Sequence, residues 1–419
     1  MTRAVVPTDL RELVRAVGAA LDGSGPPVAP APVLAAAEPD EGVALVLRTS
    51  GSTGAAREVA LSASALRASG EATHARLGGP GHWLITLPAT HVAGVQVVAR
   101  AHAGHGLTAA PGGEPFTAAG FAALVHQAPR GARRYVSLVP TQLHRLVAAA
   151  DAGEPDGLDA LCSLDAVLLG GAATPAALLR RARAAGAPVV TTYGMTETCG
   201  GCVYDGVPLA GVRARLDPGS GVVELAGPVL ADGYLGDPAA TAAAFRTDSN
   251  GTRWFRTSDL GRVGVSEDGT DDDVAAVLAA VDRDGVAEVD ERGPGRLTVL
   301  GRADDVVVTG GVNVSPAAVE DVVAGVEGIG EVCVVGVPDA EWGATVVAVV
   351  TLVAPAVAPP VVPAELVEAV RRRVADRLGR AAAPRRVVAV EDLPRRGPGK
   401  VDRAAVARLV AGLGPAEDA

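Results

Sequence analysis

The first group of side chains that could do chemistry is a loop of hydroxyl and glycine residues that ends in a cation. It comprises Thr49, Ser50, Gly51, Ser52, Thr53, Gly54, Ala55, Ala56 and Arg57. Glycines let a backbone approach a polyphosphate closely, and the surrounding hydroxyls and amides supply donors. The loop lacks the Gly-x4-Gly-Lys-Ser/Thr pattern of P-loop NTPases. A flexible polar loop without a ligand is the competing interpretation.

Two further motifs each follow an apolar segment and carry one carboxylate. The first runs from Tyr193 to Thr198, where Glu197 stands beside hydroxyl residues, a pattern that could hold Mg²⁺ next to a phosphate. The second runs from Trp254 to Gly261, where Asp259 could accept hydrogen bonds from both hydroxyls of a ribose. Taken singly, each motif is explained more simply by a turn or a turn-capping Asp.

The last two motifs lie in the C-terminal third of the chain. One joins Gly301–Asp305 to a segment with Gly310 and Gly311, which leads to a helix start at Ser315-Pro316. The other surrounds Lys400, the only lysine of the sequence. A lone ammonium in a Gly/Pro loop suggests a role that a guanidinium cannot fill, such as a compact, flexible charge that reaches a phosphate. Chance survival of one lysine is the alternative.

Alternating apolar segments predict the elements that position these motifs. We expect an N-terminal helix over Leu10–Leu21, because its apolar residues follow helical spacing. The remaining segments predict an α/β architecture with a largely buried sheet, followed by short strands and turns over 206–264. The expected strands are 43–47, 84–87, 135–139, 166–169, 189–192 and 222–225, and the expected helices are 143–150, 176–185, 316–326 and 364–379.

Composition sets the class of protein. The sequence has 419 residues, enough for two or three domains, and 48% are hydrophobic, enough for a sizeable core. Because the composition becomes Val-rich after Asp304, we expect domains over 1–303 and 304–419, and the acidic run at 271–273 suggests a surface insertion over 264–296. Its net charge of −11 argues against nucleic acid as a partner. Four cysteines are too few for a disulfide scaffold. No segment predicts a signal peptide or a membrane span, and we expect a soluble, cytoplasmic protein.

Together and in this order, the five motifs resemble those of the adenylate-forming superfamily, which contains acyl-CoA synthetases, luciferases and the adenylation domains of peptide synthetases. The resemblance covers about residues 43 to 410. It implies a large layered α/β N-terminal domain with mostly parallel sheets and a β-subdomain, and a small α+β C-terminal domain on a hinge. It also implies ATP, Mg²⁺, coenzyme A and a small carboxylic acid as ligands. The sequence leaves open whether the protein forms a homodimer.

The resemblance assigns roles to individual residues. The loop 49–57 would bind the β- and γ-phosphates, although Ala56-Arg57 stands where Pro-Lys is usual. Thr196 would contact the α-phosphate, Glu197 would bind Mg²⁺, and Lys400 would bridge the substrate carboxylate and the nucleotide. Asp304 would be the hinge. The other expected nucleotide or coenzyme A contacts are Gly170, Gly171, Ala172, Thr192, Tyr193, Gly194, Asp259, Arg302, Gly310 and Gly311.

The acid is harder to predict. His91 would lie between the acyl pocket and the adenylate, although a histidine on an apolar segment is more often a satisfied core residue. Residues 192–211 resemble those of o-succinylbenzoate–CoA ligases of menaquinone synthesis, and 136–142 agree with this. Candidates for holding a distal carboxylate are Arg134, Thr141, Gln142 and Arg145, and Cys199 and Cys202 are interpreted as pocket wall rather than metal ligands.

Three alternatives remain open at this point. Another aryl- or fatty-acid–CoA ligase would share every motif. An adenylation domain that loads a carrier protein is disfavoured, because no carrier-like Gly-x-Asp-Ser-Leu segment follows residue 403. A non-catalytic nucleotide-binding homologue is suggested by Arg57 and by the acidic insertion, but Thr196, Glu197, Asp259 and Lys400 argue against it.

Overall fold

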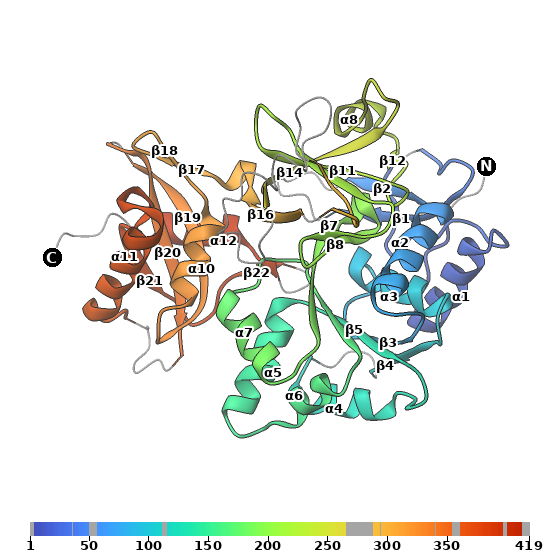
Figure 1. Ribbon diagram of the computed structural model, residues 1–419, viewed down its shortest axis with the longest axis horizontal. Helices are drawn as coiled ribbons and strands as arrows, with labels where there is room; N and C mark the ends of the chain where they lie inside the picture. The colour runs from blue at the N-terminus through green and yellow to red at the C-terminus, as the bar shows by residue number, and fades with distance from the viewer. Residues whose placement is uncertain are drawn as a thin grey trace. The chain divides into compact units, whose positions relative to one another are not determined.

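The computed structural model describes residues 4–35, 37–49, 57–110, 115–264, 288–293, 295–339, 341–353, 361–396 and 400–412 (Figure 1). By its internal contacts the chain divides into two compact units. The larger unit comprises Met1–Gly171, Arg181–Thr257 and Arg262–Thr298, and the smaller unit comprises Ala172–Arg180, Ser258–Gly261 and Val299–Ala419.

A seven-stranded sheet carries the parallel strands of the larger unit. Its order is β4-β3-β5-β6-β7-β8-β9, and the first five strands pair in parallel while β8 and β9 are antiparallel. Every residue of β6 is buried, as a strand covered on both faces requires. The strands are β3 (His82–Ile85), β4 (Leu107–Ala109), β5 (Arg134–Leu138), β6 (Ala166–Leu169), β7 (Val189–Met195), β8 (Gly200–Tyr204) and β9 (Val207–Pro208).

Helices connect these strands, and several of them begin at a residue whose side chain caps the first turn. The Asp9 carboxylate accepts from the Glu12 amide at 2.8 Å, and the hydroxyls of Ser62 and Thr117 accept equivalent bonds. Helices α1, α2 and α3 pack against one another, and α4, α5 and α6 form a second group. The helices are α1 (Leu10–Leu21), α2 (Ala63–Arg76), α3 (Val92–His102), α4 (Ala118–Gln127), α5 (Pro140–Asp151), α6 (Asp156–Cys162), α7 (Ala176–Ala184) and α8 (Pro238–Ala244).

Two further sheets, antiparallel in each pair whose register is described, lie mainly in the larger unit. The first has the order β1-β2-β12 and is formed by β1 (Val43–Arg48), β2 (Glu58–Ser62) and β12 (Gly233–Tyr234). In the second, β13-β14-β11-β10-β15 are neighbours in that order and β16 pairs with β14. Its strands are β10 (Arg213–Leu216), β11 (Val222–Ala226), β13 (Phe245–Thr247), β14 (Arg253–Gly264), β15 (Glu288–Val289) and β16 (Arg296–Arg302).

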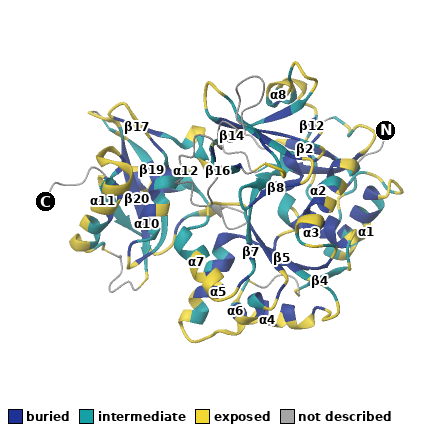
Figure 2. Ribbon diagram, viewed as in Figure 1, coloured by how far each residue is buried: buried dark blue, intermediate teal, exposed yellow. Residues whose placement is uncertain are grey.

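The core of the larger unit is mainly aliphatic, with a few aromatic side chains at its centre. Trp83, Tyr135 and Tyr204 are fully buried, and Trp83 and Tyr135 lie 5.2 Å apart between ring centroids. Buried positions follow the strands of the sheets (Figure 2). This agrees with a sequence that is 48% hydrophobic but only 3% aromatic.

The smaller unit contains a three-stranded sheet between helices. In β19 (Ile329–Asp339) and β20 (Gly343–Leu352), alternate residues enter two separate apolar clusters, one with α10 (Pro316–Ala324) and α11 (Ala364–Leu378) and one with α12 (Arg403–Gly412). The remaining strands of this unit are β17 (Val307–Thr309), β18 (Val312–Val314), β21 (Arg386–Ala389), β22 (Arg395–Arg396) and β23 (Lys400–Val401), and its 3-10 turns are η2 (Ala303–Asp305) and η3 (Arg380–Ala382). A further 3-10 turn, η1 (Thr196–Thr198), lies in the larger unit.

All the expected strands and helices are present, and several have shifted bounds: the helix expected over 143–150 begins at Pro140, the one expected over 316–326 ends at Ala324, and two strands differ as follows. Strand β3 covers His82–Ile85 rather than 84–87. The polar His82 side chain can be buried at its start because both ring nitrogens have hydrogen-bond partners, His105 O and Thr108 Oγ1. Strand β7 continues past 192 to Met195, because β8 pairs with that part of it. Most of the expected insertion lies outside the described residues. No described helix is long and apolar enough to cross a membrane.

Candidate active site

The base of the first motif is a closed hairpin. Strands β1 and β2 pair antiparallel up to Arg48 and Glu58. Beyond them, the Thr49 amide donates to Arg57 O at 2.8 Å, and the Arg57 amide donates to Thr49 Oγ1 at 3.1 Å. Residues Ser50–Ala56 lie outside the described residues, so phosphate binding by Ser50, Gly51, Ser52, Thr53 and Gly54 stays a prediction.

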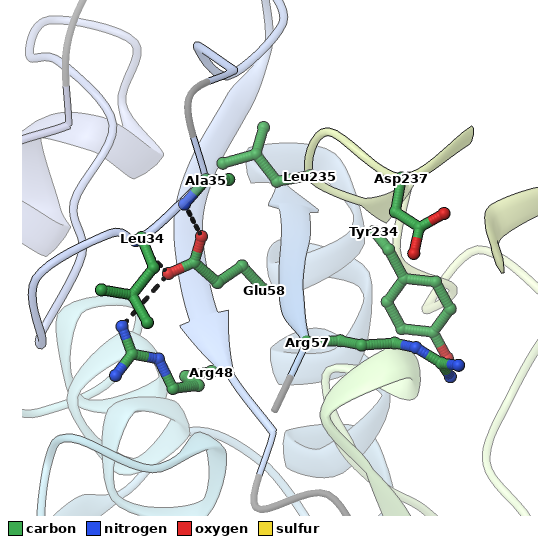
Figure 3. Close-up of a pocket in the computed structure, with 8 residues that line it drawn as sticks. All are labelled: Leu34, Ala35, Arg48, Arg57, Glu58, Tyr234, Leu235 and Asp237. Carbon is green, nitrogen blue, oxygen red and sulfur yellow. Dashed lines mark hydrogen bonds and ion pairs between the residues drawn. The ribbon is translucent and has the colours of Figure 1, made fainter. Parts of the chain in front are cut away.

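Arg57 extends from this base to the aromatic ring of Tyr234. Its guanidinium carbon lies 5.0 Å from the ring centroid, a cation–π distance, and Figure 3 shows the two side chains on one wall of a pocket of about 250 Å³. On the other side of this pocket Arg48 pairs with Glu58 at 3.3 Å, and Glu58 also accepts from the amides of Leu34 and Ala35. The exposed Arg57 is therefore oriented by Tyr234.

Glu197 also contacts Tyr234. The phenol Oη donates to Glu197 Oε1 at 3.0 Å, and the Ala231 amide donates to the Glu197 carbonyl at 2.8 Å. Burial raises the pKa of Glu197, while its own backbone, the Tyr234 hydroxyl and the Arg57 charge act in the opposite direction. A second positive charge near this carboxylate would therefore be stabilising.

The donor set at Glu197 suits a metal that arrives with a nucleotide. Among the described residues no cluster of three or more His, Cys, Asp or Glu side chains could hold a resident ion. Mg²⁺ usually binds through one or two carboxylates together with phosphate oxygens and waters, rather than in an all-protein cage. A single partly buried carboxylate therefore fits Mg²⁺ carried by ATP.

The turn that presents Thr196 and Glu197 has a fixed shape. The buried Thr198 hydroxyl accepts from the Met195 amide at 2.9 Å and donates to the Gly200 carbonyl at 2.8 Å. A Cβ on Gly194 would lie 2.1 Å from the Gly200 carbonyl oxygen, so only glycine fits there. The side chain of Thr196 is partly buried, and its contact with an α-phosphate stays a prediction.

The structure brings the Gly170 segment against the second motif. A Cβ on Gly170 would lie 2.2 Å from Thr192 Oγ1, which donates to the Leu169 carbonyl at 3.3 Å. Gly171 follows with a φ of 86° in a bend that includes Ala172. Strands β6 and β7 pair in parallel up to Leu169 and Thr191, so Gly170 and Thr192 lie side by side just beyond the paired residues, and contacts of Gly171, Ala172, Tyr193 and Gly194 with adenine stay a prediction.

His91 lies at the start of α3. It is partly buried in the N-cap position, where its side chain makes no capping hydrogen bond, and its carbonyl accepts from the Val95 amide at 3.0 Å. The turn before it is tight, because a Cβ on Gly94 would lie 2.3 Å from the Pro88 carbonyl oxygen. A role for His91 between acid and adenylate stays a prediction.

Three predicted site residues meet in the smaller unit. Arg302 Nε and Nη2 donate to Asp304 Oδ1 and Oδ2, each at 2.7 Å. Asp304 chiefly raises the pKa of the Arg302 guanidinium, and the charge of Asp259 adds to this. The expected ribose ligands Asp259 and Arg302 thus lie within electrostatic reach of each other, and Arg302 is paired with the expected hinge residue.

The other two predicted segments of the smaller unit are short hairpins. Gly310 and Gly311 join β17 to β18 with φ values of 55° and 80°, and the Gly310 amide donates to Trp342 O at 3.0 Å. A Cβ on Gly310 would lie 2.7 Å from the Trp342 ring. Lys400 pairs through its backbone with Arg396 in β22–β23. The Lys400 side chain lies outside the description, so its role stays a prediction.

Two side chains that sequence reasoning missed hold these motifs in place. Tyr234 contacts Arg57 and Glu197, and Arg403, three residues after Lys400, pairs with Glu320 and with Asp305. The available signals were indirect. Tyr234 is one of only four tyrosines in the sequence, and Arg403 is the last residue of the fifth motif, which surrounds Lys400 and spans residues 393–403.

The structure narrows the expectations about the acyl pocket. Cys199 and Cys202 are fully buried in the main core, and burial raises the pKa of Cys202 to about 12, so neither thiol lines an open cavity or favours metal binding. The side chains proposed for a distal carboxylate already bond to backbone carbonyls: Arg134 to Ser163 at 2.6 Å, Gln142 to Thr86 at 3.0 Å and Arg145 to Phe116 at 3.3 Å. The geometry selects none of these, and no such contact is described for Thr141.

Comparison with known proteins extends this picture. Residues 7–232 match the AMP-binding enzyme family, and residues 318–400 match the AMP-binding enzyme C-terminal domain. A probable 2-succinylbenzoate–CoA ligase of Mycobacterium tuberculosis (strain H37Rv) is 40% identical over 383 residues, which cover 89% of this chain and 86% of that protein. The 2-succinylbenzoate–CoA ligase of Lactococcus lactis is 28% identical over 334 residues, or 75% and 62% of the two chains.

A solved structure matches the fold. The o-succinylbenzoate CoA synthetase from Bacillus subtilis, in complex with its acyl-adenylate intermediate, superposes with a TM-score of 0.64 at 24% identity over 87% of this chain and 69% of that chain. This likeness confirms the expected fold class, with a large N-terminal domain and a small C-terminal one.

Proposed function

We propose that this chain, which belongs to the family of AMP-binding enzymes, is an acid–CoA ligase that converts o-succinylbenzoate, ATP and coenzyme A to o-succinylbenzoyl-CoA, AMP and diphosphate. The observation that carries the proposal is the convergence of Arg57 and Glu197 on Tyr234, which joins the first two motifs. The 40% identity to a probable 2-succinylbenzoate–CoA ligase over most of both chains supports the choice of acid.

The proposed reaction has two steps, adenylate formation and thioester formation. In the first, a carboxylate oxygen of the acid attacks the α-phosphorus of ATP, and diphosphate leaves with the electrons of the broken P–O bond. In the second, the coenzyme A sulfur attacks the carbonyl carbon of the acyl-adenylate, AMP leaves, and the thiol proton passes to solvent. The first step brings two anions together, so groups that offset this repulsion lower its barrier.

Residues of the larger unit would hold the triphosphate. The loop 49–57 and Arg57 would bind the β- and γ-phosphates, and Thr196 would donate to the α-phosphate. Glu197 would hold Mg²⁺, which when bound neutralises charge on the phosphate oxygens. Gly170, Gly171 and Ala172 would lie against adenine. The bonds that close the base of the loop and the fixed turn at Thr198 support this assignment.

Residues of the smaller unit would complete each half-reaction. Asp259 and Arg302 would hold the ribose, and Lys400 would bridge the acid and the α-phosphate during adenylate formation. A rotation about Asp304 would then withdraw Lys400 and bring the Gly310–Gly311 hairpin to the adenylate for thioester formation. The match of residues 318–400 to the family's C-terminal domain supports a separate domain after the hinge.

The choice of o-succinylbenzoate would place the reaction in menaquinone biosynthesis. ATP and coenzyme A are available in the cytoplasm, which is the compartment we propose. His91 would close the acyl pocket beside the reacting carboxylate. A site built to bind the distal carboxylate of a dicarboxylic acid should reject acids that lack it, because its polar groups would then lie buried and unpaired.

Acid-dependent diphosphate release tests the proposal. We expect kcat/KM for o-succinylbenzoate to exceed that for benzoate, octanoate and palmitate by at least about 100-fold. A higher value for a fatty acid would overturn the choice of acid and leave the ligase assignment intact. Absence of release with every acid, together with ATP binding, would identify a non-catalytic homologue.

A further inference from the structure

A short backbone segment ties the first motif to the second. We call residues 231–235 the strap. The Asp232 amide donates to Ala60 O at 2.9 Å and the Leu235 amide donates to Glu58 O at 2.7 Å, so the strap is fixed to the strand that follows Arg57. The Ala231 amide donates to Glu197 O at 2.8 Å. The strap therefore links the base of the phosphate loop to the turn that carries the candidate metal ligand.

The strap itself has little freedom. Arg253 donates to the Ala231 and Asp232 carbonyls at 2.8 and 2.7 Å, and the Tyr234 amide donates to Thr241 Oγ1 at 2.9 Å. A Cβ on Gly233 would lie 2.5 Å from the Thr241 side chain. Because these contacts all lie within the protein, they fix the backbone at Tyr234 without any ligand.

The Tyr234 side chain occupies this fixed position with 7% of its surface exposed. Its ring packs edge-on against Phe245 at 6.0 Å, while the Arg57 guanidinium lies over the ring and the hydroxyl donates to Glu197. Burial and the Glu197 carboxylate raise the pKa of the Tyr234 phenol, while a hydrogen bond and the charge of Arg57 act in the opposite direction. One side chain thus contacts both predicted phosphate-end groups.

We propose that Tyr234 is a positioning residue that sets the orientation of Glu197 and Arg57 together, so that the metal-bearing and terminal phosphates of ATP meet a preformed pair of charges. The inference rests on the proposed function, because Glu197 must hold the metal. The hydroxyl fixes the Glu197 carboxylate and also interacts with the Arg57 guanidinium, whereas the ring face can hold that planar group without the hydroxyl.

Two substitutions separate these parts. Tyr234→Phe keeps the ring but removes the hydroxyl, and we expect it to raise the Mg²⁺ concentration needed for half-maximal diphosphate release about 10-fold, as loss of a hydrogen bond to a charged group allows. We expect the KM for ATP at saturating Mg²⁺ to change less than about 2-fold. Tyr234→Leu removes both contacts, and it should also raise that KM about 3-fold, since cation–π contacts are weak at exposed sites.

A binding measurement supplies a readout apart from turnover. In the wild type, Mg²⁺ should increase the rise in melting temperature that ATP produces, and in Tyr234→Phe this increase should need about 10-fold more Mg²⁺. The matched control is Tyr204→Phe, which removes the hydroxyl of another buried tyrosine, bonded to Thr73 Oγ1 at 3.0 Å. We expect that control to keep the wild-type Mg²⁺ dependence.

The outcomes discriminate between explanations. Wild-type Mg²⁺ dependence in Tyr234→Phe would overturn the inference, as would an equal shift in Tyr204→Phe, which would indicate general loosening. If Glu197→Gln already abolishes the Mg²⁺ effect and adding Tyr234→Phe changes nothing further, the two residues act as one unit as proposed. Failure of the proposed function would appear separately, as absence of diphosphate release by the wild type with every acid.

Discussion

The larger and smaller units hold their motif-bearing segments by different interactions. In the larger unit the Tyr234 hydroxyl and the Ala231 amide hold Glu197, and Trp83 Nε1 donates to His74 Nε2 at 3.1 Å. In the smaller unit Arg403 pairs with Glu320 and Asp305, and its neighbours in the chain lead to Lys400. A hydrogen bond weakens steeply away from its preferred geometry, whereas paired charges also attract over longer distances.

This difference suits the two proposed roles. A triphosphate site benefits from groups that are fixed before the ligand arrives, because no reorganisation is then needed during the reaction. A segment that must present Lys400 in one step and withdraw it in the next has to stay folded while its surroundings change. The ion pairs of Arg403 lie within the smaller unit and would travel with it.

The largest effect should come from separating the two half-reactions at Lys400. We expect Lys400→Ala to lower acyl-adenylate formation by about 10³-fold, because one preorganised charge contributes on this scale. Thioester formation from supplied acyl-adenylate should stay within about 3-fold of the wild type. Single-turnover assays of each half-reaction measure both. An equal loss in the two steps would show that Lys400 is not specific to the first.

Acid should weaken the larger unit through His74. Burial, with the charges of Arg100 and His105, lowers the pKa of His74 to about 4 from 6.5, so the unfolded chain binds its proton first as the pH falls. The stability from neutral His74 is complete above pH 6.5 and is lost as the pH drops towards 4, by about 3 kcal/mol in all.

Urea unfolding at several pH values measures this loss. His74→Gln offers a matched control, because its amide oxygen can accept from Trp83 but does not titrate. We expect the variant to show a shallower fall in the free energy of unfolding between pH 6.5 and 4. Identical slopes for the two proteins would assign the acid sensitivity to other groups.

Removing the charge of Arg403 should loosen the smaller unit. Arg403→Met leaves Glu320 and Asp305 without their cation, and since these groups are partly exposed we expect a cost of about 2 kcal/mol. Amide exchange in β19 reports the loss locally. Arg181→Met removes an exposed pair with Asp151 and should cost less than about 1 kcal/mol. Equal effects of the two substitutions would mean that burial adds nothing to the Arg403 pairs.

Local pattern accounts for what the sequence predicts of the fold. The Leu10–Leu21 helix and the α10 start at Ser315-Pro316 depend on neighbouring residues, and both agree with the structure. The ends of β3 and β7 differ from the prediction. The length of a strand depends on its pairing with distant strands and on hydrogen-bond partners such as those of His82, which local pattern does not reveal.

The site was predictable as motifs but not as contacts. Tyr234 and Glu197 are 37 residues apart, and Arg403 and Glu320 are 83 apart, so no spacing rule reveals either pair. The pairing of β12 with β2 brings Tyr234 beside Arg57, and the two-residue strand that does so is too short to have a periodic pattern. Side chains that hold a motif are therefore found only after the sheets are known.

The smallest effect should come from returning Arg57 to the family's usual lysine. The Tyr234 ring favours a planar guanidinium, whereas an ammonium on a flexible stem keeps the charge but loses much of the stacking. We expect Arg57→Lys to raise the KM for ATP about 3-fold in the wild type, in keeping with a weak exposed cation–π contact, and to leave kcat unchanged. In Tyr234→Leu, where no ring remains, the same substitution should have no further effect. Steady-state kinetics of the four proteins decide the point, with Arg181→Lys as a control for charge-conserving change at a remote exposed pair. A 3-fold rise that persists without the ring would mean that some contact other than the Tyr234 ring orients Arg57.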